Sequence, residues 1–258
     1  MIDLFSDILA CRDNTLTRLD ARVKLLVAAG GIGAVLFSRN PVLPLALLAL
    51  AVLAALALRL PAGLLFRRML SPLGIVLVLV ALKSLMGGAT PLVTIPVGPW
   101  HLTASREGAA EGLLIGLRVL GAAGVVVLLG AVTPAHRIFH ALRWLGLPAA
   151  WVEIAVLMYR YTFVLLDQVE DVVQAQRVRL GYATPRRASR SVGALAGLVL
   201  LRAMDQSDRT YEAMCARLYR GSWPSAPLMP LARRDWACLL LSLGSLGALF
   251  MLLEGVAR

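Results

Sequence analysis

Long apolar stretches separated by short polar segments run through most of this sequence. A helix needs about 20 mostly apolar residues to cross the hydrocarbon core of a membrane. Lys24 and Arg39 flank the first apolar stretch closely, so that span needs snorkelling side chains or local thinning of the bilayer. The pattern predicts an all-α integral membrane protein with about five transmembrane helices. The predicted spans are Leu25–Phe37, Pro41–Leu58, Met69–Met86, Gly112–Val132 and Trp236–Leu253.

Between the third and fourth predicted spans, at about Gly87–Glu111, apolar and polar residues alternate. The alternating stretches Val93–Val97 and Trp100–Thr103 lie on either side of Gly98-Pro99. Alternation on both sides of such a turn is typical of a β-hairpin. We therefore expect a small hairpin in an outer loop.

The longest polar segment, residues 133–235, contains two stretches in which apolar residues recur with helical spacing. This spacing predicts amphipathic helices at Asp167–Gly181 and Arg202–Tyr219. Both end in arginines followed by glycine, and we expect Gly181 at the C′ position that closes a helix. The chain is thus expected to comprise an N-terminal membrane region with four spans (1–132), a cytoplasmic helical region (133–235) and a last span with the C-terminus (236–258).

Composition and charge support this organisation. Of the 258 residues 59% are hydrophobic and 16% are charged, and the mean hydropathy is +0.77, which excludes an ordinary soluble domain. The net charge of +11 does not indicate nucleic-acid binding, because the basic residues cluster on one side of the membrane. With the N-terminus inside, 21 of the 26 lysines and arginines are cytoplasmic: four in residues 1–24, three in 59–70 and fourteen in 133–235. This distribution satisfies the positive-inside rule.

A seven-span arrangement is the alternative. It would add spans at Leu145–Leu166 and Ser191–Met204 and would place Glu153 and Arg160 inside the bilayer. It would also move five arginines between positions 177 and 190 to the outside. Charged side chains within a span are costly, so we favour five spans.

Sites for ATP and for a coupled ion are not evident. A phosphate loop needs a Gly-x-x-x-x-Gly-Lys-Ser/Thr sequence, but Lys24 is followed by Leu25 and Lys83-Ser84 is preceded by Leu82. None of the five spans has an acidic residue in its interior, and Arg118 is the one interior charge. We expect Arg118 to reach the interface or to pair with a neighbouring helix rather than to bind substrate.

Candidate metal ligands are equally sparse. His136 and His140 share a helix face at spacing i, i+4, but no third ligand lies near them in the sequence. Cys11, Cys215 and Cys238 are far apart and suggest neither a disulfide nor a zinc site. We therefore predict no metal site, no cofactor and no catalytic residue, and a protein that is not an enzyme.

Several motifs resemble one family across most of the chain. They resemble the transmembrane T components (the EcfT/CbiQ family) of energy-coupling-factor ABC transporters, most closely its cobalt-transport permeases. Ala21 departs from the family pattern, which usually has proline there. The motifs are Asn14–Leu25, Thr133-Pro134, Ala141–Pro148, Met158–Tyr161, Ala175–Gly181 and Tyr211–Gly221.

This resemblance implies a scaffold without catalytic activity that links two ATP-binding cassette ATPase subunits to a substrate-binding membrane subunit similar to CbiM. It also allows for a small accessory membrane subunit in the complex. Membrane lipid is a further expected partner. The expected place is the bacterial inner membrane, with several spans and a cytoplasmic N-terminus. Cobalt is the expected cargo. The alternatives are a T component for nickel or a vitamin, or a membrane-bound enzyme such as a lipid transferase, for which a carboxylate cluster is missing.

In the family, each of two coupling helices ends in an Ala-Arg-Gly motif that sits in a groove of an ATPase subunit. The corresponding segments here are Val178-Arg179-Leu180-Gly181 and Ala216-Arg217-Leu218, with Arg220-Gly221 just beyond. We favour Arg217 over Arg220 as the second coupling arginine, because Arg217 and Arg179 have similar neighbours. The residues that the resemblance assigns to ATPase coupling are Arg179, Gly181, Ala216, Arg217, Arg220 and Gly221.

The predicted topology can be tested with a cysteine introduced near Arg187 in a variant without the native cysteines. Because residues 133–235 are expected to be cytoplasmic, an impermeant thiol reagent should label this site only after the cells are permeabilised. Strong labelling in intact cells would reverse the assignment.

Overall fold

The computed structural model describes residues 19–58, 62–86, 91–97, 100–221 and 231–255. The chain divides into two compact units. The first, which we call the membrane unit, consists of Met1–Ala141 and Pro230–Arg258, and the second, the coupling unit, is Leu142–Met229.

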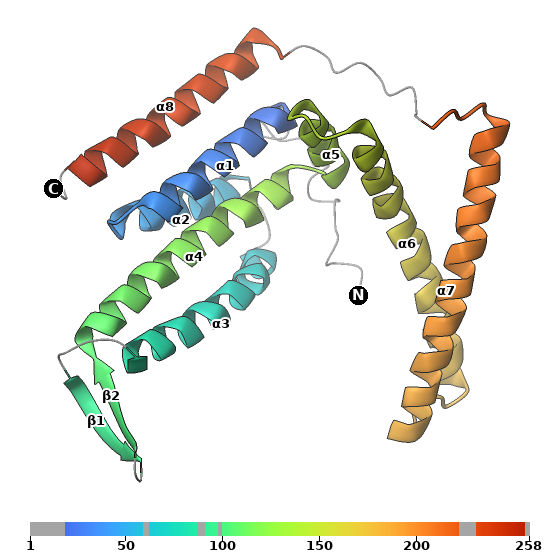
Figure 1. Ribbon diagram of the computed structural model, residues 1–258, viewed down its shortest axis with the longest axis horizontal. Helices are drawn as coiled ribbons and strands as arrows, with labels where there is room; N and C mark the ends of the chain where they lie inside the picture. The colour runs from blue at the N-terminus through green and yellow to red at the C-terminus, as the bar shows by residue number, and fades with distance from the viewer. Residues whose placement is uncertain (1–18, 59–61, 87–90, 98–99, 222–230, 256–258) are drawn as a thin grey trace. The chain divides into compact units, whose positions relative to one another are not determined.

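Helices of the membrane unit lie where the apolar stretches predict them (Figure 1). Three of them contain stretches that are long and apolar enough to cross a membrane, which are Leu65–Leu85, Arg106–Val132 and Arg233–Leu253. The fold class is the predicted one, an all-α multi-pass membrane protein. The elements of the membrane unit are α1 (Ala21–Phe37), α2 (Val42–Ala57), α3 (Ala62–Met86), β1 (Pro91–Val97), β2 (Trp100–Ser105), α4 (Arg106–Val132) and α8 (Arg233–Gly255). Helix α5 (Ala135–Trp144) contains the boundary between the two units.

Helices α1 and α2 are shorter than a typical span. They have 17 and 16 residues, or about 26 and 24 Å at a rise of 1.5 Å per residue, against a hydrocarbon core of about 30 Å. The prediction of a short first span therefore agrees with the length of α1, and α2 is short as well.

The coupling unit contains two long helices, α6 (Ala149–Val178) and α7 (Pro185–Ala216). The predicted starts at Asp167 and Arg202 are wrong, because each amphipathic stretch is only the second half of its helix. Residues 149–178 contain neither glycine nor proline, so the apolar half of α6 continues into the amphipathic half without a break. Helix α7 begins at Pro185, where the Thr184 side chain accepts a hydrogen bond from the Arg187 amide.

Helix α6 is a fourth helix of spanning length and apolar composition. It overlaps the Leu145–Leu166 span of the seven-span alternative and lies within the stretch predicted to be cytoplasmic. The five-span count and the cytoplasmic location of residues 133–235 therefore stay predictions.

The predicted hairpin is confirmed. Strands β1 and β2 pair in antiparallel fashion, with Val97 opposite Trp100 and Thr94 opposite Thr103. An irregularity between Pro91 and Val93 shifts the register at the far end. The turn residues Gly98 and Pro99 lie outside the described residues.

Helix α4 is the centre of the membrane unit, and its buried glycines face its neighbours. A Cβ built at Gly116 would lie 2.7 Å from Val76 of α3, and one at Gly121 would lie 2.9 Å from the Pro44 carbonyl oxygen of α2. Small residues let helix backbones approach closely inside a membrane, where no hydrophobic effect drives helices together. The glycines thus determine how closely α2 and α3 pack on α4.

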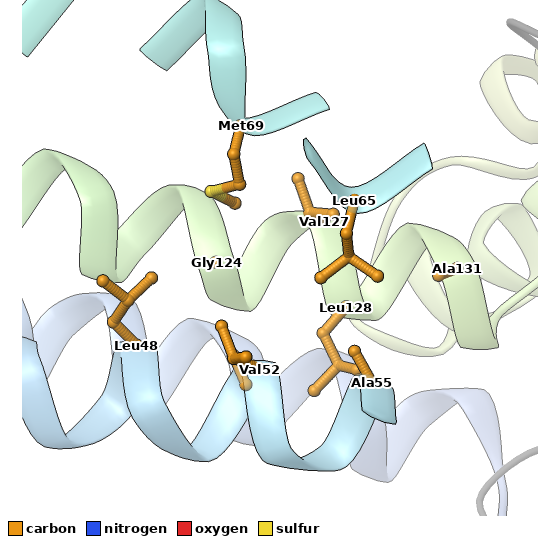
Figure 2. A pocket seen from close by; sticks show the side chains of 10 residues that line it. Leu48, Val52, Ala55, Leu65, Met69, Gly124, Val127, Leu128 and Ala131 are labelled. Atoms are coloured by element: carbon orange, nitrogen blue, oxygen red, sulfur yellow. The ribbon is translucent and has the colours of Figure 1, made fainter. Parts of the chain in front are cut away.

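An apolar crevice lies where these three helices meet (Figure 2). Leu48 and Val52 of α2, Leu65 of α3 and Leu128 of α4 point towards it. Its volume is about 20 Å³, close to that of a single water molecule. The crevice is a small gap in helix packing, with neither the size nor the polar groups of a metal pathway.

Much of the apolar surface of the membrane unit faces outward, as expected for contact with lipid. Phe66 of α3 and Leu241 of α8 are 68% and 74% exposed. Among the described residues of this unit, few large side chains are fully buried, and one small buried cluster consists of Val35, Leu43 and Leu47.

Arg118 of α4 donates a hydrogen bond from Nη2 to the carbonyl oxygen of Ser38, the C-cap residue of α1. A cation at the carboxyl end of a helix is favoured by the helix dipole and by the free carbonyl groups there. Nearby, the Asn40 amide donates to the Leu253 carbonyl of α8 over 3.4 Å. Arg118 thus pairs with a neighbouring helix, which is the role favoured from the sequence.

Packing at the α2–α4 contact can be tested with Gly121→Ala. The added Cβ meets backbone atoms of Pro44, which cannot rotate away, so we expect a loss of about 1–3 kcal/mol of stability. Thermal unfolding of the protein in detergent measures it.

The matched control is Gly130→Ala on the same helix, where a Cβ has nothing within 4 Å. This variant should be as stable as the original chain or slightly more stable, because alanine favours helix over glycine. Equal stability of the two variants would contradict the packing role.

Candidate coupling site

Helix α6 ends in a tight cap built around Arg179. Arg179 is the C-cap residue, and Leu180 follows in the left-handed conformation with φ = 56°. The Gly181 amide donates to the Gln176 carbonyl at 2.8 Å, and the Leu180 amide donates to the Arg177 carbonyl at 3.0 Å. These two bonds form a Schellman motif. The prediction that Gly181 occupies C′ is wrong, because Leu180 is at C′ and Gly181 is one residue beyond.

Helix α7 ends in the same way. Arg217 is its C-cap residue, and Leu218 is left-handed with φ = 62°. The Tyr219 amide donates to the Met214 carbonyl at 3.1 Å, and the Leu218 amide donates to the Cys215 carbonyl at 3.0 Å. Arg179 and Arg217 therefore occupy equivalent positions in two matching caps.

Leucine is an unfavourable residue at this position. Helix α5 ends in a third Schellman motif, formed by the Leu147 and Gly146 amides, in which Gly146 has φ = 102°. Glycine takes this conformation without penalty, whereas a residue with a Cβ pays roughly 1–2 kcal/mol. Strained residues of this kind concentrate at functional sites, and here both lie directly after the candidate coupling arginines.

Both caps present apolar side chains and a guanidinium group to solvent. Val178, Leu180 and Leu218 are 85%, 65% and 81% exposed. Arg179 and Arg217 are exposed as well, and neither guanidinium group forms a hydrogen bond or ion pair with the described part of the chain. Arginine and exposed apolar residues together are typical of surfaces that bind another protein.

Arg220 and Gly221 lie beyond the second cap. Gly221 has φ = 85°, and Ala216 is the last residue of α7. Only Arg217 matches Arg179 in its position relative to a helix end, so the geometry favours Arg217 as the second coupling arginine. The assignment of the six coupling residues stays a prediction.

The two caps lie at opposite ends of α7. Its 32 residues span about 48 Å, and α6 returns alongside it, as the hydrogen bond from Thr210 to the Tyr161 hydroxyl shows. The structure therefore does not bring Arg179 and Arg217 together, and each is available to a separate partner.

Behind the first cap, the loop residues pack tightly on the start of α7. A Cβ at Gly181 would lie 2.7 Å from the Ser191 Oγ and 2.9 Å from the Gln176 carbonyl. Ser191 Oγ donates to the Gly181 carbonyl at 3.0 Å, and the Gln176 amide donates to the Ser191 carbonyl at 3.0 Å. Gly181 is thus required for close approach of the loop to α7.

An open groove of about 320 Å³ adjoins this loop. Its walls come from the last turn of α6 and the first turns of α7, and they carry Arg179, Arg187 and Arg190. Arg187, Arg190, Leu180 and Leu218 are site residues that were not predicted from the sequence. The cluster Arg186-Arg187-Arg190 was the only sign of this groove in the sequence.

The N-terminal motif has a structural role where it is described. Asp20 caps α1 by accepting from the Arg22 amide at 3.1 Å. Lys24 Nζ donates to the carbonyl of Val132, the last residue of α4, at 3.4 Å. The beginning of this motif, Asn14–Arg18, lies outside the described residues.

His136 and His140 are exposed on α5. Among the described residues, no three His, Cys, Asp or Glu side chains gather as a metal site. Cys11 and the His101 side chain are not among the described parts of the chain.

Comparisons with known proteins find similarity to proteins described as cobalt transport proteins. The family model described as CbiQ, cobalt transport protein, matches residues 12–227. A cobalt transport protein CbiQ of Rhodobacter capsulatus is 32% identical over 151 residues, which are 58% of this chain and 62% of the relative.

Two further relatives match over a similar share of the chain. The uncharacterized protein MJ1089 of Methanocaldococcus jannaschii is 30% identical over 58% of this chain and 56% of its own. A putative fused cobalt transport protein CbiMQ of Methanocorpusculum labreanum is 26% identical over 52% of this chain and 22% of its own. The chain thus covers less than two thirds of the length of each relative.

The strain in the caps can be tested with Leu180→Gly and Leu218→Gly. Removing the Cβ relieves the left-handed conformation, so each helix end should gain about 1 kcal/mol of local stability. The amides of Gly181 and Tyr219, which close the two caps, should then exchange more slowly with deuterium. Faster exchange would show that the leucines stabilise the caps.

Proposed function

Since the chain belongs to the CbiQ family of cobalt transport proteins, we propose that it is the transmembrane scaffold and coupling subunit of an ATP-driven importer of the energy-coupling-factor type. Cobalt is its cargo. In this role the chain has no catalytic activity of its own, and it transmits movement between subunits that do the chemistry and subunits that bind the metal.

The pair of matching caps at the ends of α6 and α7 is the observation that carries the proposal. Each cap presents one arginine without a partner in the described chain, next to exposed apolar side chains. A guanidinium group can form paired, charge-assisted hydrogen bonds with a carboxylate or with backbone carbonyls. Two equivalent docking points suit two copies, or two close relatives, of one partner.

These partners are two ATP-binding cassette ATPase subunits. The lysines of this chain lack the sequence of a phosphate loop, so the proposal assigns ATP hydrolysis to separate subunits. The separation of the two caps along α7, about 48 Å, allows the ATPase subunits to bind without competing for one surface.

The metal is bound by a separate membrane subunit similar to CbiM. The relative named as a fused CbiMQ protein supports this partner, because its name joins the two components in one chain. The exposed apolar surface of the membrane unit is compatible both with lipid and with such a subunit. A nickel or vitamin importer is the alternative, since the described residues form no metal site that would select cobalt.

The proposed place is the bacterial inner membrane, with the N-terminus and the coupling unit on the cytoplasmic side, where ATP is available. The distribution of basic residues supports this orientation.

Substitution of the coupling arginines tests the proposal. Arg179→Ala and Arg217→Ala each remove a charge-assisted contact worth roughly 1.5–3 kcal/mol. Each single variant should retain less ATPase and take up cobalt more slowly, and the double variant should lose both ATPase subunits. Co-purification and cobalt uptake by reconstituted complexes measure the two effects.

Arg220→Ala is the matched control, because Arg220 is also exposed but lies beyond the cap. It should assemble and transport normally. A loss confined to Arg220→Ala would move the second anchor three residues along the chain, and normal assembly of the double variant would refute the coupling role.

A further inference from the structure

The two caps match, but their surroundings differ. After the first cap, the short loop leads directly into α7, whose first turns place Arg187 and Arg190 in the same groove as Arg179. After the second cap, the chain is described only as far as Gly221, and Arg220 is the only other basic residue there.

The groove at the first cap is strongly and uniformly positive. From Arg177 to Arg190 the chain carries five arginines and no acidic residue. The nearest acid before it on α6 is Asp171, eight residues before Arg179 or about 12 Å along the helix. The amino-terminal end of α7 adds the positive end of its helix dipole.

The guanidinium groups of the three groove arginines form no hydrogen bond or ion pair with other described residues. The backbone around them, in contrast, is held in place by the hydrogen bonds between Gln176, Gly181 and Ser191, and by the Tyr182 hydroxyl donating to Gln176 Oε1 at 2.7 Å. The backbone of the groove is thus held in place, and its charged side chains are available to a ligand.

On these grounds, and resting on the proposed function, we propose that the groove formed by Arg179, Arg187 and Arg190 binds carboxylate side chains of the ATPase subunit that docks at the first cap. The two ATPase subunits are then held unequally. The subunit at the first cap is bound more tightly and with stronger dependence on salt than the subunit at the second.

Carboxylates of a protein fit the groove better than lipid phosphates. Asp167, Glu170 and Asp171 are exposed on α6, and Asp205 and Asp208 are exposed on α7. A negatively charged membrane surface would repel these residues along the length of the helix pair. A protein partner, in contrast, contacts the groove locally and leaves the acidic residues in solvent.

The experiment uses the full-length chain in nanodiscs of neutral phosphatidylcholine and the purified ATPase subunit that co-purifies with it. The Arg217→Ala background leaves the first cap as the principal docking point. In this background, Arg187→Ala and Arg190→Ala should each weaken ATPase binding about tenfold. The dependence of Kd on NaCl concentration should become shallower, because fewer charges are paired.

Two sets of controls accompany these variants. Arg186→Ala removes a neighbouring exposed arginine that does not line the groove and should bind as the background does. Arg187→Lys and Arg190→Lys keep the charge but lose the planar guanidinium group. Their affinity for the ATPase subunit should lie between that of the background and that of the alanine variants. Recovery of binding with lysine also shows that the coupling unit is folded.

Three results would overturn the inference, and they can be told apart. If Arg187→Ala and Arg190→Ala bind normally while Arg179→Ala does not, the groove is not a carboxylate site, although the proposed function stands. If the alanine variants lose ATPase binding only when the nanodiscs contain phosphatidylglycerol, the groove holds a lipid headgroup. If Arg179→Ala with Arg217→Ala also binds the ATPase normally, the proposed function itself fails.

Discussion

The close contact of α4 with α2 and α3 is the constraint on which the membrane unit depends. Glycines on two sides of α4 bring its backbone so near to Pro44 of α2 and Val76 of α3 that a single added methyl group would collide. Within a membrane, such contacts replace the hydrophobic effect as the source of helix association. Two further hydrogen bonds to helix-terminal carbonyl groups secure the assembly: Arg118, near the middle of α4, donates to the end of α1, and Lys24 of α1 donates to the end of α4.

In the coupling unit, by contrast, two residues adopt a backbone conformation that their residue type disfavours. Helix α5 closes with Gly146 in the left-handed position, which shows that the chain uses glycine in such a cap. Leu180 and Leu218 occupy the same position in α6 and α7 at a cost of roughly 1–2 kcal/mol each. Their exposed side chains contribute little to the fold, and this cost supports the proposal that the caps belong to a surface that binds a partner.

Much of this fold follows from residue patterns, and the exceptions have physical causes. The apolar stretches predict α1–α4 and α8, and alternation predicts the hairpin. The starts of α6 and α7 were missed because the amphipathic pattern begins only where one face becomes polar, whereas the helix continues as long as nothing breaks it. Leu180 at C′ was missed because sequence preference favours the adjacent Gly181. The grouping of Arg187 and Arg190 with Arg179 depends on how the loop folds back, which spacing along the chain does not reveal.

The length of α7 has a mechanical consequence. A single helix joins the two caps, so it acts as a strut that sets the distance between whatever is attached at its ends. If the attached bodies move towards each other, the strut must swing as a whole or flex. Its first half contains Gly193 and Gly197, each with open space around the missing side chain, and glycine is among the weakest helix formers. Bending stress applied at the two ends would therefore concentrate at these residues, and stiffness there would determine how faithfully a displacement at one end reaches the other.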